Sequence, residues 1–156
     1  MHNIHPVPLG PPFTVLDMDM IVGLGIDIVE IERIHASLAR FGTTFLQRVL
    51  HETELAALPA QGEHVSTRLA EYVAARFAAK EAGAKALGTG IAEGISMQDI
   101  RVVSASNGKP QISLHGKAKE YADALGACNC LISLTHSRNT AGAVVILEAP
   151  DARNSE

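Results

Sequence analysis

Two carboxylates, Asp27 and Glu81, stand in apolar stretches of the sequence and are the first candidates for chemistry. Carboxylates brought together from two elements repel each other unless a proton or a cation joins them. Mg²⁺ typically takes one or two protein carboxylates and completes its shell with phosphate oxygens and water. The pair therefore predicts a Mg²⁺ site whose ligand is a pyrophosphate or a nucleotide.

Positive charge and glycine lie close to Glu81 in the sequence. Lys85 and Arg76 would supply charge to the phosphates, and the turn Gly88-Thr89-Gly90 would supply backbone amide donors. No Walker-type spacing makes this pattern specific. A second interpretation stays open, in which Glu81 and Lys85 form a local pair on a solvated flank, worth about 0.2–0.5 kcal/mol.

A long helix from about Thr67 to Leu87 must position Glu81. Steps of four residues give a stripe that is apolar at first and then charged: Leu69, Val73, Phe77, Glu81 and Lys85. The glycines at 88 and 90 end this helix where a ligand can approach the backbone closely.

A strand over Ile21–Val29 must position Asp27. Alternate residues separate into two faces, with Val22, Leu24, Ile26 and Ile28 on one and Gly23, Gly25 and Asp27 on the other. We expect the first face to lie in the core. The second face is a bare backbone surface, which suits either a ligand or a closely packed helix that Asp27 caps.

The rest of the chain predicts an α+β domain, with a mostly antiparallel sheet packed against the long central helix. Helical spacing after Ile31 stops at Gly42, a short helix follows Thr43 or Thr44, and another begins near His51. A hairpin is predicted next, with strands at 100–104 and 111–115. A short helix at 118–125 and two apolar strands at 130–135 and 141–147 complete the domain. No repeated βαβ unit of the dinucleotide-binding kind is evident.

A chain of 156 residues, 47% hydrophobic and 19% charged, suits one globular domain. Residues 1–19 hold four of the seven prolines and neither lysine nor arginine, so we expect a loose extension there and not a signal peptide. The single domain is expected at 20–148, with a C-terminal tail at 149–156. Translation from Met20 is an open alternative, which would make the extension an artefact.

Charge and cysteine usage narrow the class of protein. The net charge of −4 argues against a nucleic-acid binder, and no apolar run approaches the ~18 residues of a membrane span. Cys128 and Cys130 match neither a zinc knuckle nor a C-x-x-C redox pair. We expect buried, reduced thiols in a cytoplasmic protein.

Four blocks of the sequence together resemble the holo-acyl-carrier-protein synthase family of phosphopantetheinyl transferases. The blocks follow that family's order between residues 21 and 148, and they are Gly25–Arg33, Arg76–Ala82 with Lys85–Gly90, Gly108-Lys109-Pro110, and Ser133-Leu134-Thr135-His136. The resemblance implies the 4′-phosphopantetheinyl transferase fold and a Mg²⁺-dependent enzyme. Such an enzyme moves 4′-phosphopantetheine from coenzyme A to a serine of apo acyl carrier protein in fatty acid biosynthesis and releases adenosine 3′,5′-bisphosphate.

The resemblance also implies roles for single residues. Asp27 and Glu81 match the family's Mg²⁺ ligands, and Lys85 matches a residue that contacts phosphate. Gly88-Thr89-Gly90 matches part of the surface that binds coenzyme A, and Pro110 and His136 match residues of its adenine and 3′-phosphate region. Arg33 matches a residue that contacts the carrier protein. Similar short-chain members are homotrimers whose active sites lie between subunits. Two features depart from the family pattern: Thr135 stands where serine is commoner, and the stretch 137–140 is not acidic. They weaken the assignment of roles near His136, which on its own is more simply a structural histidine.

The mechanism that these roles imply is governed by charge. Attack of the serine hydroxyl on the β-phosphorus builds charge on the leaving bisphosphate, which Mg²⁺ and Lys85 offset. The base is either Glu81 or a metal-associated water that Asp27 or Glu81 orients, and we favour the water because a carboxylate bound to a cation is a weaker base. An acidic carrier protein requires a segregated basic face, for which the candidates are Arg33, Arg40, Arg48 and Arg68.

Two rival functions remain open at this stage. A module that only binds coenzyme A or a nucleotide would keep the glycine turn and the basic residues, but it would not need both carboxylates. A Mg²⁺-dependent phosphohydrolase would need both carboxylates, but it would turn over without a carrier protein.

Overall fold

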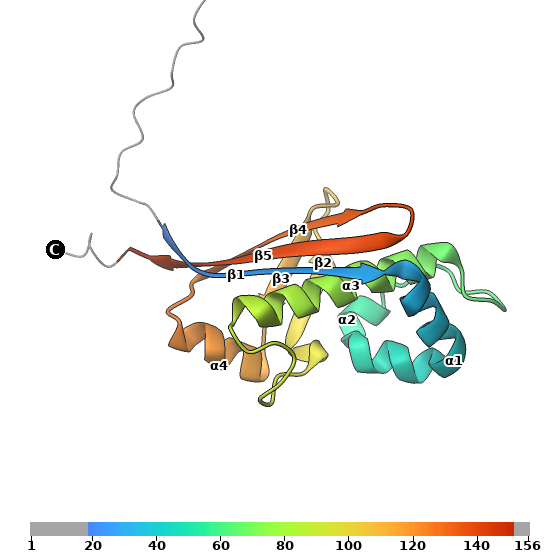
Figure 1. The fold of residues 1–156 in the computed structure, drawn as a ribbon, viewed down its shortest axis with the longest axis horizontal. Helices are drawn as coiled ribbons and strands as arrows, with labels where there is room; N and C mark the ends of the chain where they lie inside the picture. Colours follow the sequence, from blue (N-terminus) through green and yellow to red (C-terminus); the bar gives the residue numbers. More distant parts are fainter. Residues whose placement is uncertain (1–18, 152–156) are drawn as a thin grey trace, which may run out of the picture.

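The structure, a computed structural model, describes residues 19–151, so the predictions for 1–18 and 152–156 lie outside the described residues. Its elements in order are β1 (Asp19–Glu30), α1 (Ile31–Val49), α2 (Glu52–Leu55), α3 (Thr67–Ala86), the 3₁₀ turn η2 (Met97–Asp99), β2 (Ile100–Ser104), β3 (Pro110–Leu114), α4 (Gly116–Ala124), β4 (Asn129–His136) and β5 (Thr140–Pro150). β1, β5 and β4 form one antiparallel sheet, and β2 and β3 form a separate hairpin. Figure 1 shows α3 running along the sheet, which confirms the predicted α+β architecture.

The face of β1 that the sequence assigned to the core is mostly exposed in this chain, so that prediction was wrong for three of its four residues; only Val22, at a shift in the strand register, packs against the core. Leu24, Ile26 and Ile28 are 65%, 59% and 68% exposed. The glycine face lies against α3 instead. An added Cβ at Gly25 would stand 1.9 Å from the carbonyl oxygen of Ala82, so only a residue without a side chain lets the helix approach this closely. The close-packed helix, one of the two alternatives for this face, is therefore the observed one.

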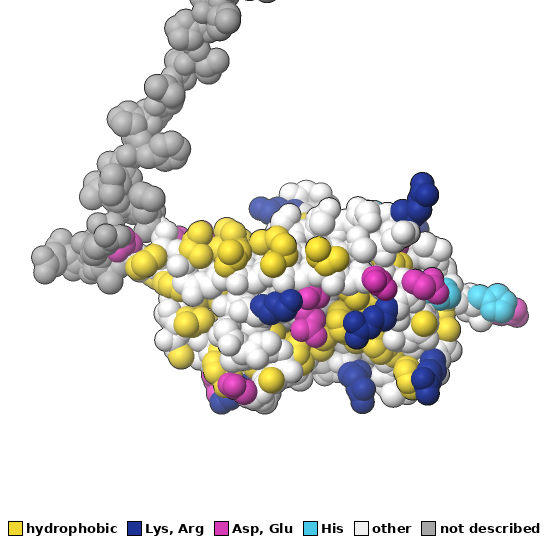
Figure 2. Space-filling model, viewed as in Figure 1, with side chains coloured by type: hydrophobic (Ala, Val, Ile, Leu, Met, Phe, Trp, Pro, Cys, Tyr) yellow, Lys and Arg dark blue, Asp and Glu magenta, His cyan; other side chains and the backbone are white. Residues whose placement is uncertain are grey.

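Strand register extends the exposed apolar face across the whole sheet. Leu24 is opposite Ile146 and Ile26 is opposite Val144 on β5, and Ile146 is in turn opposite Leu131 on β4. Residues directly opposite each other on paired strands project from the same face. In Figure 2 hydrophobic side chains form a row along the sheet, with charged side chains of both signs below the row. A continuous apolar surface of this kind marks an interaction site.

The helix α3 is buried on nearly all sides, because small residues let the sheet and the other helices pack around it. Ala70, Ala74, Ala78, Ala79, Ala82 and Ala84 have no exposed surface. The predicted helix end at Leu87 differs from the observed end at Ala86 by one residue. Within residues 19–151 no helix has the length and apolar character needed to cross a membrane.

A glycine break divides α1, as the sequence indicated. Gly42 has φ 50° and ψ −127°, which are not helical, and helical geometry resumes after it until Val49. The two predicted helices are therefore the two halves of one kinked element.

The two cysteines differ in exposure, which corrects the prediction that both are buried. Both thiols are free, but Cys128 is exposed, whereas Cys130 is half-buried on β4. Desolvation raises the pKa of the Cys130 thiol to about 11. The thiolate is the reactive form of cysteine, so Cys130 has very little of it at neutral pH.

We expect iodoacetamide at pH 8 to alkylate Cys128 and to modify Cys130 at least about tenfold more slowly. Peptide mass spectrometry over a time course measures both rates in one sample. Equal rates at the two positions would contradict the desolvation of Cys130, and full reactivity of Cys130 after addition of urea is the matched control.

Candidate active site

Asp27 and Lys85 meet directly, although 58 positions separate them in the sequence. The Lys85 ammonium donates to Asp27 Oδ1 at 2.8 Å and to the backbone carbonyl of Ile26 at 3.1 Å. The hydrogen bond to Asp27 raises the pKa of Lys85. The ion-pair partner of Lys85 is thus Asp27 on β1, and not Glu81 one helical turn away as the local interpretation required.

Glu81 belongs to the same electrostatic group. Burial raises the pKa of the Glu81 carboxyl, and the negative charge of Asp27 raises it further. Lys85 and Arg33 act in the opposite direction on this carboxyl. Asp27, Glu81, Lys85 and Arg33, from β1, α3 and α1, therefore influence one another, as the sequence predicted for the two carboxylates and the lysine.

The glycine turn after α3 caps the helix, which corrects one part of its predicted role. The backbone N–H groups of Gly88, Thr89 and Gly90 donate to the carbonyls of Lys85 and Ala84. The last carbonyls of a helix lack intrahelical partners and take such donors when the chain turns back, so these amides are not free to bind phosphate. Gly88 and Gly90 have φ of 84° and 68°, and apart from each glycine and its two chain neighbours no atom of the described residues lies within 4 Å of where its Cβ atom would be. What the turn offers a ligand is an open backbone surface.

Arg76 lies away from the two carboxylates, contrary to the prediction that it charges their ligand site. Arg76 and Glu81 are five positions apart along the helix, which places them on different sides of α3. The Arg76 guanidinium stacks 3.4 Å from the centre of the Tyr72 ring, and its buried Nε has no hydrogen-bond partner among residues 19–151. Burial lowers the pKa of Arg76.

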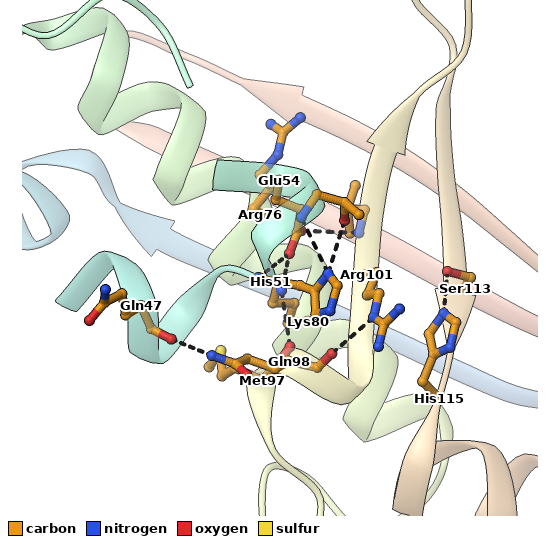
Figure 3. Close-up of polar contacts among 12 residues, drawn as sticks. Gln47, His51, Glu54, Arg76, Lys80, Met97, Gln98, Arg101, Ser113 and His115 are labelled. Carbon is orange, nitrogen blue, oxygen red and sulfur yellow. Dashed lines mark hydrogen bonds and ion pairs between the residues drawn. The ribbon is translucent and has the colours of Figure 1, made fainter. Parts of the chain in front are cut away.

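A fully buried ion pair close to Arg76 was missed by the sequence reasoning. Lys80 Nζ lies 2.7 Å from Glu54 Oε2 and 3.0 Å from the carbonyl of Met97, and neither charged side chain is exposed. Glu54 also accepts hydrogen bonds from the backbone N–H of Val102 and of His51 (Figure 3). One signal in the sequence was available, since His51-x-x-Glu54 forms a capping box at the start of α2.

Pro110 and His136 line two separate hollows of the surface. Pro110 opens β3 and lines a hollow of about 570 Å³ together with Lys109 and Leu131. His136 ends β4 and lines a different hollow of about 500 Å³ with Arg68 and Tyr72. Neither hollow is lined by Asp27, Glu81 or Lys85.

The chemistry of the site fits a hard divalent cation that brings other ligands with it. Among residues 19–151 no group of three His, Cys, Asp or Glu side chains could hold a metal, so the protein would supply the two carboxylates of Asp27 and Glu81. Two carboxylates suit Mg²⁺, which commonly keeps waters and binds phosphate oxygens in its remaining positions.

Comparison with known proteins decides the family. The model of the 4′-phosphopantetheinyl transferase superfamily matches residues 23–130. The holo-[acyl-carrier-protein] synthase of Desulfovibrio desulfuricans is 50% identical over 130 residues, which cover 83% of this chain and 99% of that protein. The chain belongs to the holo-[acyl-carrier-protein] synthase family.

Solved structures of the family share the fold. The Plasmodium yoelii acyl carrier protein synthase with ADP bound is 33% identical and has a TM-score of 0.77, over 86% of this chain and 99% of that chain. The Helicobacter pylori synthase in complex with coenzyme A is 33% identical with a TM-score of 0.66, over 80% of this chain and 98% of that chain. The superfamily match includes Asp27, Glu81 and Lys85 and ends before His136.

Proposed function

We propose that this chain transfers 4′-phosphopantetheine from coenzyme A to a serine of apo acyl carrier protein, with Mg²⁺, in fatty acid biosynthesis in the cytoplasm. The observation that carries the proposal is the grouping of Asp27, Glu81 and Lys85 at the junction of β1 and α3, in a chain of the synthase family. A protein that only bound coenzyme A would not need two carboxylates that repel each other.

Each residue has a part in this reaction. Asp27 and Glu81 hold the ion, and Lys85 contacts the phosphates of coenzyme A from the exposed end of α3. When bound, Mg²⁺ offsets the charge that grows on the leaving bisphosphate. Gly88, Thr89 and Gly90 give the substrate an open surface next to Lys85, because their glycines carry no side chains.

The adenine end of coenzyme A is assigned to Pro110 and His136. Both residues line hollows that already contain cationic side chains, Lys109 beside Pro110 and Arg68 beside His136. A 3′-phosphate would find positive charge in either hollow. Because these hollows are separate from Asp27 and Glu81 within one chain, we assign the complete active site to the boundary between two subunits of a homotrimer.

The exposed apolar sheet face is the surface that would join these subunits. It is formed by the exposed Leu24, Ile26 and Ile28 of β1 and Leu131 of β4, with the half-buried Val144 and Ile146 of β5 between them. Burial of such a face against other copies removes apolar surface from water, which is the main driving force of association.

We expect the double variant Leu24→Asp/Ile26→Asp to be monomeric and to lose at least about tenfold in activity, because buried carboxylates in an apolar contact are strongly unfavourable. Size-exclusion chromatography with light scattering measures the mass. The matched control is Leu125→Asp, which changes an exposed leucine at the end of α4 and should leave the mass unchanged. A natural chain that is monomeric and active would contradict the shared site.

The carrier protein is assigned to the exposed side of α1. The charge of Arg33 lowers the pKa of Glu81, so a partner bound by Arg33 would place its serine close to the carboxylates. On the same helix the exposed Phe41 ring lies 4.9 Å from the Arg40 guanidinium, which gives this surface an apolar contact as well as charge. Binding through these arginines should weaken with added salt.

Mass spectrometry of apo acyl carrier protein, incubated with this protein, coenzyme A and Mg²⁺, tests the proposed function. We expect the carrier to gain the mass of phosphopantetheine, and we expect EDTA to abolish the gain. Release of adenosine 3′,5′-bisphosphate without carrier protein would instead indicate a phosphohydrolase. Binding of coenzyme A without either product would indicate a binding module.

A further inference from the structure

Lys85 is bonded to Asp27, one of the two carboxylates that the proposed function gives to the metal. Its ammonium contacts Asp27 Oδ1 at 2.8 Å, and it holds the neighbouring carbonyl of Ile26 at 3.1 Å. A divalent cation bound by the Asp27 carboxylate repels the ammonium of Lys85 beside it, which weakens their ion pair.

The two partners differ in their freedom to move. The Asp27 side chain is 17% exposed and lies on a strand paired within the sheet, whereas the Lys85 side chain is 50% exposed near the end of α3. A lysine side chain is long and flexible, and its charge remains in solvent when it swings away. The ion pair can therefore open by movement of Lys85 alone.

We infer that Lys85 is a resident counter-ion of Asp27 that the divalent cation displaces, and that the displaced ammonium then binds the diphosphate of coenzyme A. The inference rests on the proposed function and deepens it. Metal binding releases Lys85 for the phosphates, and a diphosphate that attracts Lys85 releases Asp27 for the metal. Metal and diphosphate therefore bind cooperatively, and each binds more weakly alone.

Lys85 and Arg33, the two cations of the site, differ in their contacts. Arg33 lowers the pKa of Glu81 through its charge, but its side chain is exposed on α1, and the bond to Asp27 Oδ1 comes from Lys85. Removing either cation lowers the positive charge of the site by one. Only removal of Lys85 also frees the Asp27 oxygen, so the two variants distinguish displacement from a general effect of charge.

Electron paramagnetic resonance of Mn²⁺, titrated alone into the protein without coenzyme A, tests the inference. We expect Lys85→Met to bind Mn²⁺ about three- to tenfold more tightly than the natural chain, and Arg33→Met to change the affinity less than about twofold, because the exposed charge of Arg33 is screened and the bond to Asp27 stays with Lys85. Lys85→Arg keeps a donor for Asp27 and should retain the weak binding of the natural chain. Unchanged affinity in Lys85→Met, or an equal gain in Arg33→Met, would overturn the inference.

Inorganic pyrophosphate supplies the second measurement. We expect it to tighten Mn²⁺ binding by a larger factor in the natural chain than in Lys85→Met, since only the natural chain has a lysine to move. An equal factor in both proteins would overturn the coupling while leaving the proposed function intact. If no variant binds Mn²⁺ with or without pyrophosphate, or if Asp27→Asn binds it as well as the natural chain, the proposed metal site itself is wrong.

Discussion

The Glu81→Gln variant is expected to lose at least about 10²-fold in kcat/KM for carrier modification while its fold becomes more stable. Glutamine keeps the size of the side chain but cannot carry the negative charge that the metal requires. Stability should rise because burial and the charge of Asp27 both raise the pKa of Glu81, which means that the ionised form is disfavoured in the folded state. A change that removes activity and adds stability points to a catalytic role.

The pH dependence of this stability gain has a definite sign. A carboxyl whose pKa is higher in the folded chain than in the unfolded chain favours folding when protonated, and that contribution is lost as pH rises through the folded pKa. In metal-free buffer, the Tm advantage of Glu81→Gln should therefore be largest near pH 8 and should vanish in acid. Asp27→Asn is the matched control, because it also loses activity but removes the charge that pairs with Lys85 and so gains no stability. Retention of more than about a tenth of the activity in Glu81→Gln would remove the residue from the metal site.

Much of the candidate site could be predicted because its residues break local patterns. Asp27 interrupts a β-branched strand, and Glu81 and Lys85 interrupt the apolar stripe of a helix, so their types and spacing stand out in the sequence. The choice of partner could not be predicted. Lys85 is one helical turn from Glu81 but bonds to Asp27, and only the packing of α3 on β1 brings that oxygen within reach.

The orientation of β1 shows a second limit. Alternation along a strand tells which residues share a face, and the division of Leu24, Ile26 and Ile28 from Gly25 and Asp27 was correct. It does not tell which face the helix covers. The glycine face was covered because it allows the closest backbone approach, which leaves the apolar face exposed in this chain. Hydrophobic residues that stay on the surface of a single chain look like core residues when only the sequence is considered.

The Glu54→Leu variant is expected to lose about 3–5 kcal/mol in free energy of unfolding, because it leaves the Lys80 ammonium buried without its carboxylate. A domain of ordinary stability has only about 5–15 kcal/mol in total, so this variant should be close to unfolding at 37 °C. Burial lowers the pKa of Lys80, and the charge of Glu54 counteracts that effect. Urea denaturation followed by circular dichroism measures the loss.

The double variant Glu54→Leu/Lys80→Met separates the cost of an unpaired charge from the value of the pair. With both charges gone, we expect much of the stability to return, because a buried ion pair is often no better than an apolar pair of similar volume. The return should be incomplete, since the backbone N–H groups of Val102 and His51 lose their acceptor. Asp123→Leu, which breaks the exposed pair with Lys119 on α4, should change stability by less than about 1 kcal/mol. A double variant as unstable as Glu54→Leu alone would instead mean that these backbone hydrogen bonds, of which the one from Val102 joins α2 to β2, account for the main contribution of Glu54.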